Sequence, residues 1–296
     1  MAEYSPMMQH YLATKEKYKD CILFYRLGDF YEMFFDDAIT TSRELELTLT
    51  GKDCGQEERA PMCGIPFHAA EIYISRLIAK GYKVAICEQL EDPKKAKGIV
   101  KRDVIRVVTP GTVIETNMLD EKKNNYIMSI YKSGLYFGMA VCDISTGDFF
   151  ATQIKETNNF STLLDEISRY APAEIVVNDM MFLTTEEIDK IKERFECYIS
   201  KISEEEYENN YDELALNYTI YSDGKELEDI ESKKLAVVAS CGLITYFNET
   251  QKIKLEHINK IYIYNTTKYM ALDINTRRNL ELTEKMRDKS KKGTLL

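Results

Sequence analysis

The chain lacks several features that mark specialised classes of protein. None of its apolar runs approaches the roughly 20 residues that span a bilayer, so no membrane contact is expected. Its N-terminus has neither the charged start nor the apolar stretch of a signal peptide. Its seven cysteines include no Cys-x-x-Cys pair, and only three histidines accompany them. This composition argues against disulfide and zinc frameworks and favours a cytoplasmic protein with no metal site.

The chain also lacks the overall positive charge of a uniformly basic nucleic-acid binder, because its formal net charge is −10. The charge is unevenly distributed. Six basic residues and one acid lie between Lys94 and Arg106, among them Lys95 and Lys97, whereas acids dominate between Lys201 and Glu231. Any single charged run is usually a solvated surface, but this alternation indicates separate modules with separate roles.

Residues 1–115 are expected to form one domain that mixes helices and strands. Hydrophobic periodicity, glycines and prolines set the expected boundaries. Helices are expected at 6–19, 36–46 and 69–80, and strands at 21–27, 30–35, 82–89 and 104–109. Residues 51–64 are rich in turn-forming residues and are expected to form turns.

Residues 116–124 are polar and are expected to link the first domain to a second one at 125–250. A three-stranded meander should open this domain, followed by alternating helices and strands. Strands are expected at 126–131, 135–143, 148–154 and 174–177, and helices at 162–170, 185–195 and 231–248. Residues 251–296, with a strand at 262–264 and a helix at 273–287, are interpreted as the start of a further, truncated region. The fold class expected for both domains is α/β.

The segment after the Gly28-Asp29 turn places an aromatic ring and a carboxylate two residues apart. In an extended segment, Phe30 and Glu32 point to one face, and Tyr31 and Met33 point to the other. A ring that stacks beside a group that hydrogen-bonds is suited to probing a nucleic-acid base. The pattern alone is also typical of a core strand, which is the commoner explanation of an aromatic-rich run.

Six stretches extend this observation along the chain. They are Arg26-Leu27-Gly28-Asp29-Phe30-Tyr31-Glu32, Pro61-Met62-Cys63-Gly64-Ile65-Pro66-Phe67-His68-Ala69, Val84-Ala85-Ile86-Cys87-Glu88-Gln89, Arg106-Val107-Val108-Thr109-Pro110-Gly111-Thr112, Asp143-Ile144-Ser145-Thr146-Gly147 and Leu272-Asp273-Ile274-Asn275-Thr276-Arg277-Arg278-Asn279-Leu280-Glu281. In content, order and spacing, they resemble the N-terminal part of the bacterial MutS family of mismatch-repair sensors.

The resemblance implies a domain organisation. Residues 1–115 would be a mismatch-recognition domain with a mixed α+β sheet, and residues 125–250 an RNase H-like connector. Residues 251–296 would begin the core or lever region. The sequence has no Gly-x4-Gly-Lys-Ser/Thr run, so no cofactor site and no enzymatic activity are expected here. ATP, magnesium and homodimer formation are expected of the full-length family member.

The resemblance also assigns roles. Phe30 would wedge into and stack on a mispaired base, while Glu32 would hydrogen-bond that base. Because phosphates disfavour a negative charge beside them, our own hypothesis is that Glu32 is at least partly protonated when bound and donates to a ring nitrogen. Lys52, Arg76, Arg102 and Arg106 are candidates for holding the DNA backbone, with a surface salt bridge as the equally weighted alternative for each. The expected partners are mismatched double-stranded DNA and a MutL-type protein that meets the connector.

Two alternatives stay open at this point. RNase H-like nucleases gather carboxylates around magnesium, and the second domain contains Asp143, Asp148, Glu166 and Asp179. Asp143 could instead cap the turn at residues 145–147, which is the simpler role. The second alternative is a module that only binds other proteins.

Overall fold

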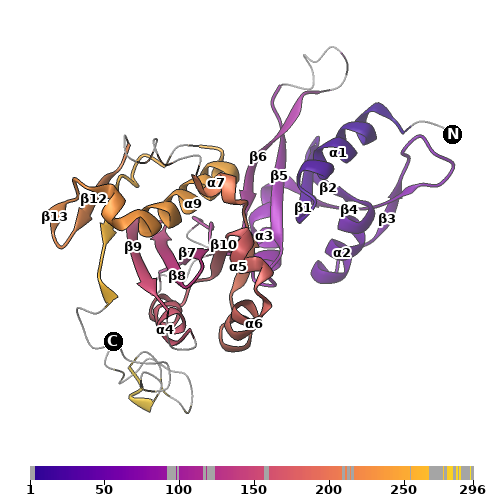
Figure 1. The fold of residues 1–296 in the computed structure, drawn as a ribbon. Helices are drawn as coiled ribbons and strands as arrows, with labels where there is room; N and C mark the ends of the chain where they lie inside the picture. Colours follow the sequence, from indigo (N-terminus) through magenta and orange to yellow (C-terminus); the bar gives the residue numbers. More distant parts are fainter. Residues whose placement is uncertain are drawn as a thin grey trace. The chain divides into compact units, whose positions relative to one another are not determined.

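The computed structural model describes most of the chain, and its residues divide into two compact units. The described residues are 4–91, 98, 100–115, 118, 124–156, 160–208, 211, 214, 217–253, 255–266 and scattered positions after 275. Unit 1 comprises Met1–Asp120 with Phe247–Lys254, and unit 2 comprises Glu121–Tyr246 with Leu255–Leu296. Each unit is built around one mixed sheet (Figure 1).

The sheet of unit 1 has six strands in the order β3-β4-β2-β1-β5-β6. The strands are β1 (Cys21–Leu27), β2 (Phe30–Phe34), β3 (Thr50–Lys52), β4 (Ala60–Pro66), β5 (Lys83–Gln89) and β6 (Arg102–Val108). The helices are α1 (Pro6–Lys17), α2 (Phe35–Leu45) and α3 (Ala70–Ile78), with a short 3-10 turn, η1 (Phe67–Ala69), before α3. Only β1 and β5 pair in parallel, and the other neighbours are antiparallel.

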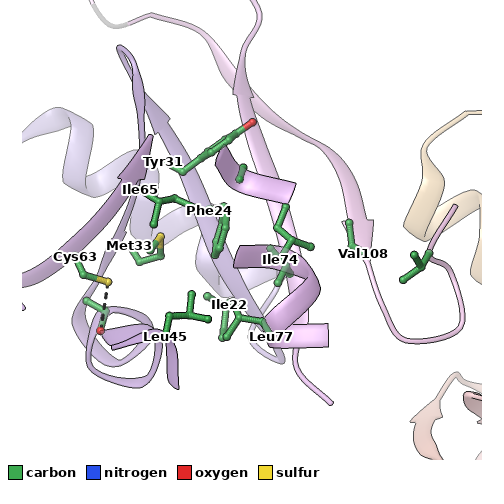
Figure 2. Packing of buried hydrophobic residues seen from close by; sticks show 14 residues of the cluster. Ile22, Phe24, Tyr31, Met33, Leu45, Cys63, Ile65, Ile74, Leu77 and Val108 are labelled. Carbon is green, nitrogen blue, oxygen red and sulfur yellow. Dashed lines mark hydrogen bonds between the residues drawn. The ribbon is translucent and has the colours of Figure 1, made fainter. Parts of the chain in front are cut away.

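Helices cover both faces of this sheet. Successive strand residues point to opposite sides, so each strand contributes apolar side chains to both faces. On one face, Leu23 and Tyr25 of β1 pack in a cluster with Met8 and Tyr11 of α1. The other face packs against α2 and α3. Figure 2 shows this second cluster, in which Phe24, Tyr31 and Met33 lie with Ile74 and Leu77 of α3.

The sheet of unit 2 has eight strands in the order β11-β10-β7-β8-β9-β14-β12-β13. The strands are β7 (Tyr126–Ser133), β8 (Tyr136–Asp143), β9 (Asp148–Lys155), β10 (Glu174–Val177), β11 (Tyr198–Lys201), β12 (Thr219–Ser222), β13 (Lys225–Glu226) and β14 (Lys260–Ile263). The helices are α4 (Ser161–Tyr170), α5 (Asp179–Leu183), α6 (Thr185–Arg194), α7 (Glu204–Glu208) and α9 (Lys234–Gln251), with a 3-10 turn, η2 (Ile230–Lys233). β7, β8 and β9 form an antiparallel meander, and β10 joins β7 in parallel.

The α/β class expected from the sequence is confirmed in both units. In unit 2, the meander is followed by a strand that pairs in parallel with β7, and the RNase H-like fold expected for this domain stays a prediction. The sequence indicated a turn-rich segment at 51–64 and did not predict strands there, but β3 ends and β4 begins inside this segment. Both strands contain glycine or proline, and they form by pairing with their neighbours and with β2.

Several expectations fall on residues that the structure does not describe. Most of the linker at 116–124, Lys94, Lys95 and Lys97 of the basic run, and most of the expected helix at 273–287 lie outside the described residues. The domain boundaries expected from the sequence stay predictions. Within the described residues, the length and hydropathy of the helices give no candidate for a membrane span.

Candidate nucleic-acid interface

A tight hairpin turn presents Phe30 at the end of the sheet. Leu27 pairs with Phe30, so Gly28 and Asp29 form a two-residue loop, and Gly28 has the positive φ (+58°) that such loops require. The backbone N–H of Phe67 donates to the carbonyl of Asp29 over 3.0 Å and ties the turn to the segment after β4. Phe30 is 46% exposed, so its ring is accessible at the turn.

Arg26 contacts this turn and the segments that lie next to it. Its Nε donates to the Gly28 carbonyl over 2.6 Å, and its guanidinium carbon lies 3.7 Å from the centroid of the Phe67 ring. A terminal nitrogen of Arg26 also pairs with Glu88 over 3.1 Å. The hydroxyl of Tyr31 donates to the same Glu88 carboxylate. Burial, together with that hydrogen bond, raises the pKa of Tyr31, so this hydroxyl stays a neutral donor.

The predicted division of faces along β2 is confirmed. Tyr31 and Met33 are buried in the cluster under α2 and α3. Phe30 and Glu32 alternate with them and point to the other face, where they lie opposite Pro66 and Gly64 of β4. A Cβ built on Gly64 would lie 3.5 Å from Cγ of Glu32 and 3.8 Å from Cδ1 of Phe30. The ring and the carboxylate therefore stand side by side above a residue with no side chain.

Lys52 forms an ion pair with Glu32. Its Nζ lies 3.0 Å from one carboxylate oxygen of Glu32 and 3.2 Å from the other. The two residues come from strands that do not touch, because β4 lies between β2 and β3. The Glu32 side chain is 13% exposed and that of Lys52 is 36% exposed. Lys52 thus joins the ring and carboxylate in one cluster, although the sequence suggested a separate role for it.

The other three basic candidates lie in different settings. Arg76 is exposed on α3, the helix that covers the opposite face of the sheet from Phe30. Arg102 is buried, and its guanidinium donates to the carbonyls of Arg26 and Val100. This burial weighs against a phosphate contact by Arg102. Among the described residues, no contact places Arg76, Arg102 or Arg106 beside Phe30. Their DNA-binding roles stay predictions.

Arg106 is committed to an internal ion pair. Its two terminal nitrogens donate to the two carboxylate oxygens of Glu115, and one of them also reaches the Thr112 carbonyl over 3.3 Å. Burial alone would raise the pKa of Glu115, but the hydrogen bond and the charge of Arg106 lower it overall. The pair ties the segment after β6 back to that strand.

Sequence reasoning missed three residues of this cluster. Arg26, Gly64 and Phe67 lie inside stretches that had been singled out, but no role was predicted for them. The only available signal was their closeness to Phe30 along the chain or across a hairpin. The register of β4 against β2, which places Gly64 and Pro66, was not readable because β4 itself was not expected.

The carboxylates suspected of nuclease chemistry have other partners. Asp143 is buried and accepts hydrogen bonds from the backbone N–H of Ser145 (2.9 Å), the hydroxyl of Ser145 (2.6 Å) and the backbone N–H of Asn125 (3.1 Å). The expected cap on the turn is therefore present. Glu166 accepts from Tyr264, and Asp179 pairs with Lys201 over 2.8 Å. Within the described part of the chain, no group of three or more His, Cys, Asp or Glu residues is placed to hold a metal ion.

Comparison with known proteins assigns both units to one class. Residues 5–117 match MutS domain I, and residues 125–259 match MutS domain II. The chain belongs to the MutS family. It is 58% identical to the DNA mismatch repair protein MutS of Ruminiclostridium cellulolyticum and 56% identical to that of Acetivibrio thermocellus, over the whole of this chain in each case. It is 57% identical to the protein of the same name from Clostridium novyi over 99% of this chain. The chain spans 34%, 34% and 31% of the length of these three relatives.

Proposed function

We propose that this chain recognises mispaired bases in double-stranded DNA and acts in DNA mismatch repair. Membership of the MutS family and the name of the relatives support this proposal. The observation that carries it is the exposed ring of Phe30. The ring stands on a braced hairpin turn beside a carboxylate, where a rigid sheet holds it in position.

Phe30 acts as a wedge. Inserting an apolar side chain between base steps unstacks them and kinks the duplex, at a cost of about a few kcal/mol per step. A mispair lowers this cost because its pairing and stacking are already weak. The preference for mismatches then arises from the deformability of the DNA rather than from reading a sequence. A stacking face accepts any base, so one ring serves many kinds of mispair.

Glu32 supplies the hydrogen bond that accompanies stacking. It leaves β2 on the same face as Phe30, so a base stacked on the ring presents its edge to the carboxylate. Paired DNA does not open to offer that edge, and its phosphates repel the carboxylate. Glu32 therefore favours the mispair and disfavours paired DNA.

Basic side chains and other parts of the whole protein complete the proposed activity. Arg76, exposed on α3, is available for a phosphate contact, whereas Arg102 and Arg106 must exchange internal partners to make one. For the whole protein, the family suggests a homodimer, a MutL-type partner for the second unit, and ATP with magnesium bound outside this chain. We propose binding and relay, rather than catalysis, for the chain itself. No observation favours a nuclease or a purely protein-binding module over this function.

A binding experiment tests the wedge. The whole native protein that contains this chain and its Phe30→Ala variant are titrated against a fluorescein-labelled duplex with one central G·T mispair and against its fully paired counterpart. Loss of the ring should weaken heteroduplex binding about ten- to a hundredfold, the loss expected for one base–aromatic stack. Homoduplex binding should change little.

The matched control is Ile72→Ala, which removes an apolar side chain that is 65% exposed on α3 in the same unit. It should leave both affinities as they are in the parent. Equal heteroduplex binding by Phe30→Ala and the parent would remove the basis of the proposal.

A further inference from the structure

We infer that Lys52 determines mismatch specificity as the counter-ion of Glu32, rather than as an independent contact to a DNA phosphate. The inference rests on the proposed function, since it concerns how the same carboxylate meets DNA. It assigns the residue a role that depends on Glu32.

The geometry favours a dedicated pair. Lys52 Nζ contacts both oxygens of Glu32, at 3.0 and 3.2 Å, and the contact reaches from β3 across β4 to β2. Such a span needs a clear path over β4. Gly64 provides part of it, because a side chain there would contact Cγ of Glu32. The carboxylate is the more buried partner of the two, so its charge depends on a nearby cation more than on water.

Lys52 and a DNA base can share the carboxylate. A carboxylate offers about four lone-pair positions on its two oxygens, and one ammonium does not fill them all. Glu32 can therefore stay ionised beside its cation and accept a hydrogen bond from the edge of a mispaired base, in place of the protonated donor expected from the sequence. The ammonium also offsets the repulsion between the carboxylate and the phosphates of any duplex.

Removing the positive charge of Lys52 should therefore change the affinities for mispaired and fully paired duplexes by different amounts. In a Lys52→Gln variant, the carboxylate meets the phosphates without its counter-ion, so both affinities fall. A carboxylate without its ammonium is a stronger hydrogen-bond acceptor, so its bond to a mispaired base strengthens and offsets part of the loss, whereas paired DNA offers no such bond. Homoduplex binding should fall further than heteroduplex binding, and the ratio of the two affinities should rise about threefold, within the range for a partly exposed ion pair.

A phosphate contact predicts a different pattern. Neutralising a lysine that binds only phosphate weakens both duplexes alike and lowers the salt dependence of binding by about one unit of slope. The ratio of affinities then stays constant, whatever residue occupies position 32. The two roles of Lys52 are therefore distinguished by whether its substitution changes the affinity ratio only when Glu32 is present.

The experiment is a double-mutant cycle in the whole native protein. The parent, Lys52→Gln, Glu32→Gln and the double variant are each titrated against the G·T duplex and its paired counterpart at several sodium chloride concentrations. The expected result is a raised ratio for Lys52→Gln in the Glu32 background and an unchanged ratio for the same substitution in the Glu32→Gln background. Lys52→Arg, which keeps the charge, should restore the ratio of the parent.

Lys80→Gln is the matched control, because Lys80 makes a similar pair with Glu44 over 2.9 Å in the same unit. It removes the same charge, and it should leave the ratio unchanged in both backgrounds. An equal response of the ratio to Lys52→Gln in the two backgrounds would overturn the inference alone. A parent that binds both duplexes equally would overturn the proposed function as well.

Discussion

The guanidinium carbon of Arg26 lies 3.7 Å from the centroid of the Phe67 ring, and Nε of the same residue donates to the carbonyl of Gly28. The arginine therefore connects the turn before Phe30 to the segment after β4. Through Glu88 it also reaches β5. We therefore predict that Arg26 acts as a positioning residue for Phe30 by fixing the turn that precedes it.

Arg26→Gln should lower the free energy of unfolding by about 2 kcal/mol, since it removes both a cation–π contact and a partly buried ion pair. It should also weaken heteroduplex binding more than homoduplex binding, because the turn that carries Phe30 loses its brace. Urea unfolding and the two titrations check this. Arg43→Gln is the control, since the Arg43 side chain is 70% exposed where it pairs with Glu44 and its loss should change neither quantity. An Arg26 variant as stable and as selective as the parent would show that the brace is unnecessary.

Gly64→Ala should keep the fold and reduce mismatch preference. The new methyl group would lie 3.3 Å from the Tyr31 carbonyl and would contact Glu32 and Phe30, so it restricts both side chains from below. We expect a change in unfolding free energy within about 1 kcal/mol, as for other glycine-to-alanine changes in strands. The ratio of heteroduplex to homoduplex affinity should fall. Gly51→Ala, whose methyl group would lie 3.2 Å from Cβ of Arg59 and away from Glu32 and Phe30, is the control in the neighbouring strand. If both variants kept the parent's ratio, the space above Gly64 would have no role.

The sequence predicted the half of this site that depends on local pattern. Alternation along residues 30–34 was sufficient to place Phe30 beside Glu32, since side chains in a strand alternate wherever the strand lies. The strands β1 and β10 were expected with the bounds that the structure shows. Each segment is an apolar run with a glycine or proline near one end. The local sequence pattern and the burial of the strand therefore favour the same bounds.

The other half depends on pairing between distant segments. Lys52 meets Glu32 only because β3 and β4 add to the edge of β2, and the glycines and prolines of residues 51–66 concealed both strands. For Arg106 the sequence left a phosphate contact and a salt bridge equally open, because its partner, Glu115, reaches it from the segment after β6. A surface arginine and a paired one have the same sequence signal, so only the tertiary contact distinguishes them.

The Arg106–Glu115 pair should make the free energy of unfolding depend on pH in the acidic range. The pKa of Glu115 is lowered in the folded state, so the unfolded chain binds more protons at low pH. The contribution of the pair is therefore present above the unfolded pKa of about 4.3 and is lost as the pH falls through the lower folded value. Glu115→Gln should cost about 1 kcal/mol at pH 7 and much less at pH 3.5.

Urea unfolding of the parent and Glu115→Gln at both pH values checks this sign. Glu16→Gln, at an exposed carboxyl that pairs with Lys19, is the control and should lose little at either pH. A cost of Glu115→Gln that stayed constant from pH 7 to pH 3.5 would be inconsistent with the pair.

Asp143→Asn should destabilise unit 2 without affecting any cleavage of DNA. Three donors converge on this carboxylate, and the amide would turn one acceptor into a donor facing them. We expect a loss of about 1–3 kcal/mol, the cost of leaving a buried hydrogen-bonding group unsatisfied. Urea unfolding measures the loss, and incubation of plasmid DNA with magnesium measures cleavage. Magnesium-dependent cleavage by the parent that disappears in Asp143→Asn would favour the nuclease alternative.

The wedge is tested most directly by the bend in the DNA. A duplex carries a central G·T mispair and a donor and an acceptor dye at its two ends, so that kinking shortens the distance between the dyes. At saturating concentrations of the whole native protein, the parent should raise energy transfer on the heteroduplex but not on the paired duplex. Phe30→Ala, also saturated, should leave the transfer near that of free DNA, because without the ring no base step is unstacked. A bend of the same size with alanine at position 30 would contradict the account.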